Sequence, residues 1–375
     1  MKKFVWPLLI IFFLLGGLAA ILIGQVVLPP EPRPQSIAEI SQNWFDSGHS
    51  DFTAEPFTHW DEEEPPEVPV GCAKCHSAYG YLDYLGQDGT AVEVVDHAAK
   101  IGSVVNCYVC HNPTSQIKET AIFPSGVEVT VPNQVANCLE CHQATQAGPD
   151  VAAATDGLAE DEINEDITFI NVHYKIGGAV RYGADVEVGY EYPGQTYAGF
   201  YPHVEDYQQC TDCHDPHSSA IDPQECAACH PVVSESVDVY AIRMDGTLDY
   251  DGDGDTSEGV SGEVNTIHNK FYAAIQQYAS DVLNSPIIYD STTYPYWFND
   301  SNGNGEADEG ELNFGNAYAT WSPRLLKAAY NYHLVVKDPG GFMHNATYLI
   351  QLMYDGIADL NTAVTVNMEG LIRPE

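Results

Sequence analysis

The chain has 375 residues, and its 54 Asp and Glu residues outnumber its 14 Lys and Arg residues, which gives a formal net charge of −40 at pH 7. This excess of negative charge argues against binding to nucleic acid and against docking on anionic lipid. It is typical of a solvated acidic surface, and as a whole it favours basic partners or the retention of divalent cations.

The first segment is predicted to anchor the chain in a membrane. Residues 1–3 form a short basic start, and the uncharged run 4–28 has 25 residues, enough for about 37 Å of helix. The basic start favours a cytoplasmic N-terminus, so the rest of the chain is expected on the extracytoplasmic side, in the periplasm or outside the cell. The alternative is a signal sequence cleaved near 18–20. A proline-rich and polar linker, residues 29–58, then separates the anchor from the globular part.

All ten cysteines lie in five Cys-x-x-Cys-His motifs. This spacing is the attachment signature of c-type haem. Two thiols three residues apart lie on one face of a helical turn, and the adjacent histidine can reach the iron. We therefore predict five covalently bound haems. Their thioether cysteines and proximal histidines are Cys72, Cys75 and His76; Cys107, Cys110 and His111; Cys138, Cys141 and His142; Cys210, Cys213 and His214; and Cys226, Cys229 and His230.

Other uses of these cysteines fit less well. Structural zinc sites would pair the motifs, and five motifs cannot be paired. A redox-active dithiol would be expected once, and disulfides would not require a histidine after every second cysteine.

The motifs organise the middle of the chain into a predicted pentahaem domain at 59–236. Their first cysteines are separated by 35, 31, 72 and 16 residues, so the last two haems are expected near contact. The longest gap contains strand-like sequence and predicts a β-hairpin insertion at 150–202. Because the remaining segments are short, the haems are expected to supply the core, and the haem-free protein to be largely unfolded.

Residues 237–375 contain no haem motif and predict an α-helical C-terminal region. Apolar residues recur at helical spacing over 263–283. Ser322 and Pro323 predict the start of a second helix that ends near Lys337, and Asn345 can cap a third. The predicted fold is thus a multihaem cytochrome c: a mostly irregular, short-helical, haem-packed domain with a small β insertion, followed by this helical region.

Two acidic loops in this region resemble calcium loops. Residues 300–311 match the twelve-residue EF-hand loop, although the sequence before them is not helical. A second loop begins in the same way at Asp249 but has Val260 where the last glutamate should stand, and Glu258 or Glu263 could replace it. Each loop could instead be an acidic surface turn. The calcium candidates are Asp300, Asn302, Asn304, Glu306 and Glu311 in one loop and Asp249, Asp251 and Asp253 in the other.

Nine histidines outside the motifs are available as second axial ligands, whereas the four methionines after the initiator all follow the last motif. Histidine on both faces of each haem, with low potential, is therefore expected. The pairing cannot be read from the sequence. The distal candidates are His59, His97, His173, His203 and His217, with His344 in reserve.

The five motifs, the run from Asp212 to His217 and the stretch from Asp338 to Asn345 resemble the membrane-associated polyhaem c-type cytochromes of extracytoplasmic respiration. That resemblance implies an electron relay between a quinol-linked respiratory membrane complex, or other cytochromes, and an outside acceptor. A Cys-x-x-Cys-Lys motif is lacking, which argues against an enzyme of the multihaem nitrite reductase type, and no residue is assigned a catalytic role. A terminal reductase and a subunit of a cytochrome filament are the alternatives.

Overall fold

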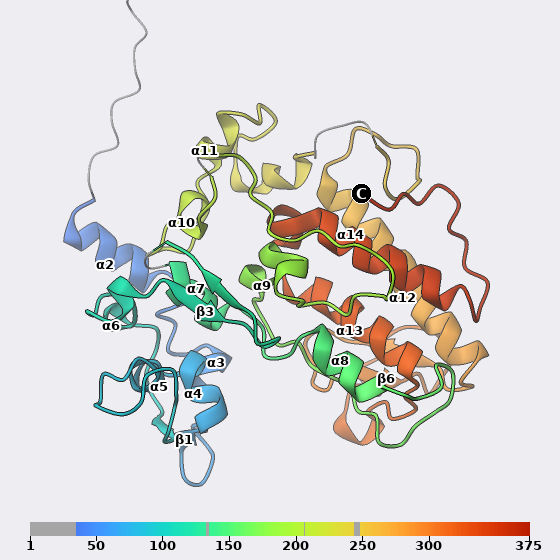
Figure 1. The fold of residues 1–375 in the computed structure, drawn as a ribbon, viewed down its shortest axis with the longest axis horizontal. Helices are drawn as coiled ribbons and strands as arrows, with labels where there is room; N and C mark the ends of the chain where they lie inside the picture. The colour runs from blue at the N-terminus through green and yellow to red at the C-terminus, as the bar shows by residue number, and fades with distance from the viewer. Residues whose placement is uncertain (1–34, 133–134, 206, 244–247) are drawn as a thin grey trace, which may run out of the picture. The chain divides into compact units, whose positions relative to one another are not determined.

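The computed structural model describes residues 35–132, 135–205, 207–243 and 248–375 (Figure 1). The predicted anchor at 4–28 lies outside these residues. Within the described part of the chain, no helix combines the length and the apolar character needed to cross a bilayer. Residues up to Asn43 form one unit, which includes most of helix α2 (Ile37–Phe45), and Trp44–Glu375 form a second. The sites below all belong to the second unit.

The region with the haem motifs is built from short helices. Each Cys-x-x-Cys segment forms a helical turn, and in four motifs the histidine N–H donates to the carbonyl of the first cysteine at 2.8–3.0 Å. This bond places both thiols of a motif on one face of the turn. The helices are α3 (Glu55–Thr58), α4 (Val70–His76), α5 (Ala78–Tyr84), α6 (Cys107–Cys110), α7 (Val135–Cys141), α10 (Cys210–Cys213) and α11 (Pro223–Ala227), with 3-10 turns η1 (Ser115–Ile117) and η3 (Ser236–Ala241).

The described strands form three antiparallel pairs of two strands each. β1 (Glu67–Val68) pairs with β2 (Ala99–Lys100), and β3 (Thr120–Ile122) pairs with β4 (Glu128–Thr130). β5 (Ile287–Tyr289) pairs with β6 (Trp297–Asn299). The structure is thus rich in helices, with sheets that are too small to form a layer.

The β-hairpin predicted at 150–202 is not found. All of these residues are described, and they contain α8 (Gly148–Thr155), α9 (Gly177–Tyr182), the 3-10 turn η2 (Gly183–Asp185) and irregular chain. The backbone groups of this segment form hydrogen bonds with side chains of α13 (Pro323–Lys337) and not with a second strand. Asn331 accepts from the Tyr190 N–H at 2.8 Å and donates to its carbonyl at 2.9 Å, and Tyr330 donates to the Val188 carbonyl. The β-branched and aromatic residues that suggested strands are buried against helices instead.

Three longer helices follow: α12 (Val260–Asp281), α13 (Pro323–Lys337) and α14 (Gly341–Leu360). The hydroxyl of Ser322 accepts the Leu325 N–H and caps α13, which begins with Pro323. Inside α14, Asn345 has non-helical backbone angles, and its side-chain oxygen accepts the Tyr348 N–H at 3.1 Å. Asn345 therefore caps the longer part of α14. The 3-10 turn η4 (Phe314–Asn316) lies between β6 and α13.

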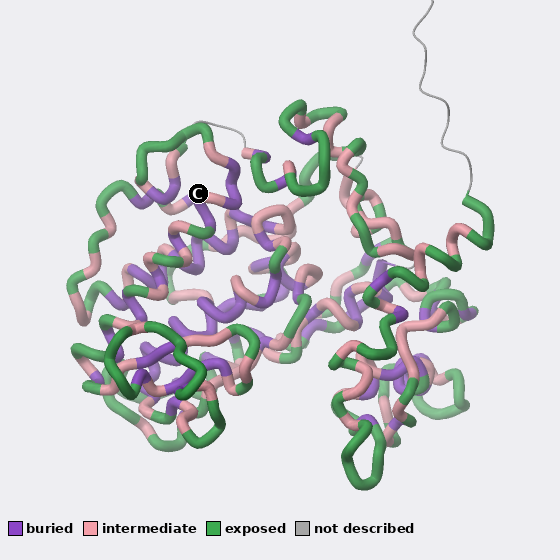
Figure 2. Tube along the Cα trace, turned by 180° about the vertical axis from the view of Figure 1, so that it is seen from behind, coloured by how far each residue is buried: buried purple, intermediate pink, exposed green. Residues whose placement is uncertain are grey.

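The largest apolar core joins the helical region to the chain before it. It contains Leu139, Ile176 and Val188 together with residues from α12, α13 and α14, and large aromatic side chains such as Trp297 and Tyr330 are fully buried in it. In Figure 2, many residues along these three helices are coloured purple as buried. Residues before and after position 237 therefore share one apolar core. The haem-motif region adds three small clusters of three to five buried residues, so its protein core is slight.

Candidate haem sites

Each of the five motif histidines lies opposite a second histidine from another part of the chain. The pairs, with the distance between ring centroids, are His76 and His173 (5.7 Å), His111 and His217 (6.2 Å), His142 and His49 (6.3 Å), His214 and His344 (6.4 Å), and His230 and His203 (6.2 Å).

These separations match two axial ligands of one iron. An imidazole nitrogen binds a transition metal at about 2 Å, so opposed histidines place their nitrogen atoms roughly 4 Å and their ring centroids roughly 6 Å apart. In the tightest pair, Nε2 of His76 lies 3.4 Å from Nε2 of His173. With ten cysteines at the attachment spacing beside them, the five pairs fit bis-histidine haem c.

Hydrogen bonds fix which nitrogen of several rings points to the partner. Nδ1 of His76, His142 and His214 bonds to the backbone carbonyls of Pro56, Lys175 and Ser219, at 2.8, 2.7 and 3.2 Å. Because Nδ1 is occupied in each case, Nε2 is left for a metal. Such an outer bond orients the ring and makes it a more basic ligand.

His344 is held in the same way by a carboxylate. Its Nδ1 lies 2.7 Å from Oδ2 of Asp338, whose side chain is nearly fully buried. Burial acts to lower the pKa of His344, but Asp338 outweighs it, and the net shift of the pKa is upward. As a ligand of a haem iron, His344 would be made more basic by this bond, which would favour a low potential.

Burial disfavours the protonated form of three other histidines that face a motif histidine. The pKa of His49, His173 and His203 is lowered from its ordinary value, first by burial and next by the facing motif histidine. A histidine binds metal in its neutral form. The backbone of His173 and His203 also has positive φ, at 80° and 56°. That conformation is unfavourable for a histidine and is often found at functional sites.

The predicted distal candidates divide into two groups. His173, His203, His217 and the reserve His344 each lie opposite a motif histidine, whereas His59 and His97 do not. Nδ1 of His59 bonds to Glu55 one turn earlier, and Trp60, the next residue, packs on His76 instead. His97 lies among acidic side chains, with Nδ1 2.6 Å from Asp96 and 3.1 Å from Asp83. Local carboxylates thus hold both rings away from the motifs.

Sequence reasoning missed His49, which faces His142. Its position before the first motif carries no spacing signal, since its partner belongs to the third motif.

Thiol contacts indicate how the attachment sites are ordered. Cys75 of the first motif is a close neighbour of Cys141 of the third, and Cys138 of the third is a close neighbour of Cys210 of the fourth. Cys213 of the fourth interacts with Cys226 of the fifth. The third site is therefore adjacent to both the first and the fourth, and the fourth to the fifth. His217 lies three residues after His214 of the fourth motif and faces His111 of the second, so the second site is next to the fourth motif.

The remaining histidines have structural contacts. His268 Nε2 bonds to the Tyr332 carbonyl at 3.1 Å, and burial lowers its pKa to about 4. His333 bonds to the Tyr289 hydroxyl at 2.9 Å and to Asn171 at 2.8 Å. Neither ring faces a motif histidine.

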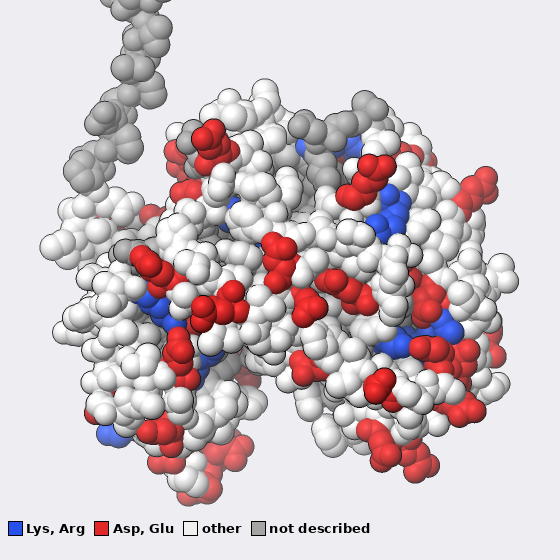
Figure 3. All heavy atoms as spheres, viewed as in Figure 1, with Lys and Arg blue, Asp and Glu red and all other residues white. Residues whose placement is uncertain are grey.

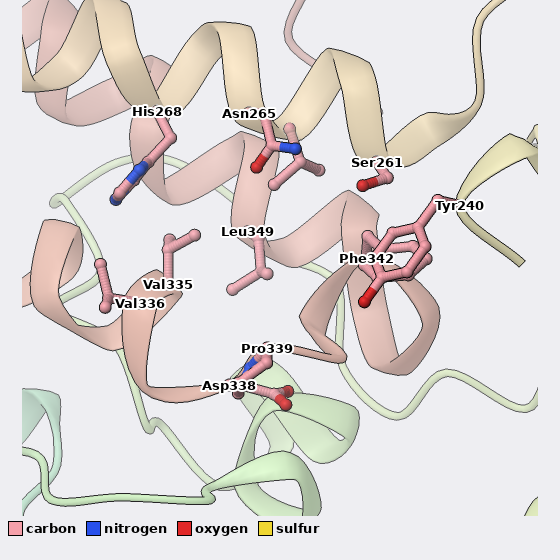
Figure 4. Close-up of a pocket in the computed structure, with 11 residues that line it drawn as sticks. Tyr240, Ser261, Asn265, His268, Val335, Val336, Asp338, Pro339, Phe342 and Leu349 are labelled. Carbon is pink, nitrogen blue, oxygen red and sulfur yellow. The ribbon is translucent and has the colours of Figure 1, made fainter. Parts of the chain in front are cut away.

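A cavity of about 260 Å³ lies between η3, α12 and the loop from α13 to α14 (Figure 4). Its polar groups come from Tyr240, Ser261, Asn265, His268 and Asp338. His344 is not among the lining residues, but Asp338, which bonds to its Nδ1, is.

The two predicted calcium loops are both compact. In the first, Asp300 accepts the N–H groups of Gly303 and Gly305 at 2.7 and 2.9 Å, and Glu311 accepts that of Ser301. Oε2 of Glu311 is buried without a hydrogen-bond partner. The amides of Asn302 and Asn304 both donate to Asp308, Glu306 is exposed, and β6 precedes the loop in place of an EF-hand helix. The second loop gathers Asp249, Asp251 and Asp253 around Glu258 and Glu263.

The described residues thus combine five haem attachment motifs with five facing histidine pairs. C-type polyheme cytochrome OmcC of Geobacter sulfurreducens is 26% identical to this chain over 366 residues, which is 83% of this chain and 45% of that protein. C-type polyheme cytochrome OmcB of the same species, in two strains, is 27% identical over 363 residues, 82% of this chain and 46% of that protein. The chain is similar to polyhaem c-type cytochromes.

This similarity supports covalently bound haem c and multihaem electron transfer. The chain spans about half the length of the curated relatives it matches. No protein-family model matches the sequence, and no solved structure is similar to it.

Proposed function

We propose that the chain carries five covalently bound haems and relays electrons between a respiratory membrane complex and an acceptor outside the cell membrane, without catalysing a reaction of its own. The observation that carries this proposal is the set of five facing histidine pairs. When both axial positions of an iron are taken by histidine, the site favours low-potential electron transfer over substrate binding. The closeness of cysteines from different motifs supports an order of neighbouring sites in which the third lies next to the first and the fourth, and the fourth next to the fifth.

The two alternatives have less support. A terminal reductase needs one haem with an open position, but every motif histidine has a facing partner. A filament in which a histidine of one copy binds iron in the next is not required either, because each motif histidine faces a histidine of its own chain.

The acidic surface bears on the choice of partner. Figure 3 shows Asp and Glu side chains spread over the visible face with few Lys and Arg. We propose that redox partners, a quinol-linked complex or other cytochromes, present basic surfaces, which would make association fast and sensitive to salt.

We further propose single-pass anchoring through residues 4–28 with the haem region on the extracytoplasmic side. Protease treatment of intact spheroplasts would test this proposal.

Electron paramagnetic resonance of the purified, haem-loaded protein tests the relay most directly. Together with a haemochrome assay that counts haem per chain, it should show five low-spin haems and no substantial high-spin signal. A high-spin haem in the resting protein, or a methionine–iron absorption band, would contradict the relay and favour the reductase. Fewer than five haems per chain would contradict the pentahaem assignment separately.

A further inference from the structure

The loop between η3 and α12 and the first turn of α12 together bring five carboxylates close to one another. The carboxylate oxygens of Asp249, Asp251 and Glu263 all lie within 4.8 Å of one another, and so do those of Asp251, Asp253 and Glu258. Asp251 belongs to both groups and is therefore at the centre of the cluster. Like charges at this spacing repel strongly unless a cation or a proton lies between them.

Asp251 is the feature that distinguishes this cluster from an acidic surface turn. Its side chain is 0% exposed, and its Oδ2 has no hydrogen-bond partner, although Oδ1 accepts the Asp253 N–H at 3.0 Å. Oε1 of Glu258 is also buried without a partner. Burial raises the pKa of Asp251, and the neighbouring carboxylates of Asp249 and Asp253 raise it further. An ionised carboxylate left in this state is costly, so the site lacks a counter-charge.

The neighbouring basic side chains do not supply that charge. Arg243 donates to Oε1 of Glu263 at 2.6 Å and to the backbone carbonyls of Leu248 and Glu258. Lys270 donates to the backbone carbonyl of Asp251 and not to its carboxylate. Among the described residues, Glu263 is thus the one member of the cluster with a basic side-chain partner.

We propose that this cluster binds one Ca²⁺ through carboxylate oxygens of Asp249, Asp251, Asp253 and Glu258. Hard divalent cations take all-oxygen ligand sets, and the cluster contains neither histidine nor cysteine, which zinc and copper would use. Several crowded carboxylates fit Ca²⁺ with its flexible coordination, whereas Mg²⁺ retains waters in a strict octahedron. Glu258 would take the role of the glutamate that Val260 replaces at the end of the EF-hand pattern.

The bound ion would join three parts of the chain. The Ile372 N–H donates to the Tyr250 carbonyl at 2.9 Å, which ties the C-terminal tail to the loop, and the Val260 N–H donates to Ile242 at the start of α12. Ile242 packs in a small apolar cluster with Cys226 of the fifth motif. Calcium at this loop would therefore fasten the segment after the fifth haem site to the helical region. The inference does not depend on the proposed relay.

Native mass spectrometry of the haem-loaded protein, stripped with chelator and then given CaCl₂, tests the site. The Glu311→Gln variant is used as background, so that the 300–311 loop does not contribute. We expect this variant to bind one Ca²⁺ per chain and to melt at a higher temperature with Ca²⁺ than with chelator. Adding Asp251→Asn should abolish both effects, whereas adding Asp166→Asn, at an exposed carboxylate outside the cluster, should leave both intact.

The proposal is overturned if the Glu311→Gln protein binds no Ca²⁺, or if Asp251→Asn leaves the bound ion in place. Equal stabilisation by MgCl₂ would overturn the choice of calcium. If Asp251→Asn fails to fold, Glu258→Gln serves as the second variant and should weaken binding while five haems remain attached. A chelated protein that is as stable at neutral pH as the calcium-loaded one would show that a proton, and not a metal ion, neutralises the cluster.

Discussion

The ammonium group of Lys74 lies 3.0 Å from the carboxylate of Glu140, and each of these residues immediately precedes the second cysteine of its haem motif. Glu140 is 0% exposed and also lies 3.0 Å from Lys118, while the Tyr84 hydroxyl donates to it at 3.0 Å. Since Lys74 is on α4 and Glu140 on α7, the ion pair fastens the first attachment site to the third. The residues between the cysteines of a motif, which do not bind haem, here set how two haem sites are packed.

Replacing Glu140 by glutamine should destabilise the haem-loaded protein by about 3 kcal/mol, because it leaves two lysines beside a buried neutral group. Lys74→Met should cost less, since Lys118 still pairs with Glu140. Denaturant unfolding of the single and double variants gives the coupling energy between the two residues. Haem content should remain at five per chain. Equal stability of Glu140→Gln and the parent protein would show that the pair does not hold the two sites together.

Replacing His49 by alanine should convert one haem from low-spin to high-spin, because His49 faces His142 of the third motif. Electron paramagnetic resonance of the oxidised protein measures the change. His59→Ala and His97→Ala are the matched controls, since both residues precede a motif by a short spacing but bond to Glu55 and Asp96. Their spectra should match that of the parent. A high-spin signal in either control, with none in His49→Ala, would reverse the assignment.

The contrast between these histidines shows what the sequence can predict and what it cannot. The proximal ligands follow from local chemistry, because a histidine next to the second cysteine is placed by the same helical turn. The facing histidines come from segments far away in the sequence, so their positions depend on the tertiary fold and not on local spacing. His217 could be inferred from its spacing to His214, whereas His49 and its partner in the third motif share no local pattern.

The same distinction holds for the fold. Caps and apolar spacing are local signals, and the sequence placed a helix start at Ser322 and Pro323, where α13 begins. The segment 167–201 has the composition of strands but forms none, because Asn331, Tyr330 and Tyr348 bond its backbone groups. Such bonds link residues far apart in the chain, and composition does not reveal them.

His217 and His344 should serve two different haems. His217 faces His111 of the second motif, and His344 faces His214, three residues before His217. Each single alanine variant should therefore produce one high-spin haem, and the double variant two, measured by spin quantitation with haem content unchanged. If His217 instead completed the haem of its own motif, His344→Ala would leave the spectrum unchanged and the double variant would show only one high-spin haem.

Glu191 should make the stability of the protein fall as pH rises. Burial, together with Glu187 and Asp185, raises its pKa from 4.5 to about 7, although the Tyr348 hydroxyl donates to it. Because the folded state holds this proton more tightly than the unfolded state, the contribution is complete below pH 4.5 and is lost as pH rises to about 7. Since the side chain is partly exposed, solvent screening reduces this loss to about 2 kcal/mol. Glu191→Gln should remove that part of the slope in denaturant midpoints between pH 5 and pH 8. Glu162→Gln, at an exposed position, should retain it, and an unchanged slope in Glu191→Gln would contradict the assignment.

Calcium should bind the 300–311 loop and stabilise the helical region around it without changing the haems. The buried Oε2 of Glu311 lacks a partner, Asp300 is 9% exposed, and Gln276 of α12 donates to the Gly305 carbonyl at 2.8 Å. Gly305 has φ of 78°, which the sharp turn of such a loop requires. A ligand that binds only the folded state at about 100 times its dissociation constant adds roughly 2.7 kcal/mol.

Melting with and without chelator measures this effect, in an Asp251→Asn background so that only one loop contributes. Chelator should lower the melting temperature, and Glu311→Gln should remove most of that response, because it replaces the carboxylate expected to bind calcium through both oxygens. Glu309→Gln, at an exposed position of the same loop, should respond like the background protein. The reduced haem spectrum should be identical in all variants, since the loop lies outside every haem motif. If chelator does not affect melting in this background, the loop is an acidic turn held by its own Asp300 and Glu311 hydrogen bonds.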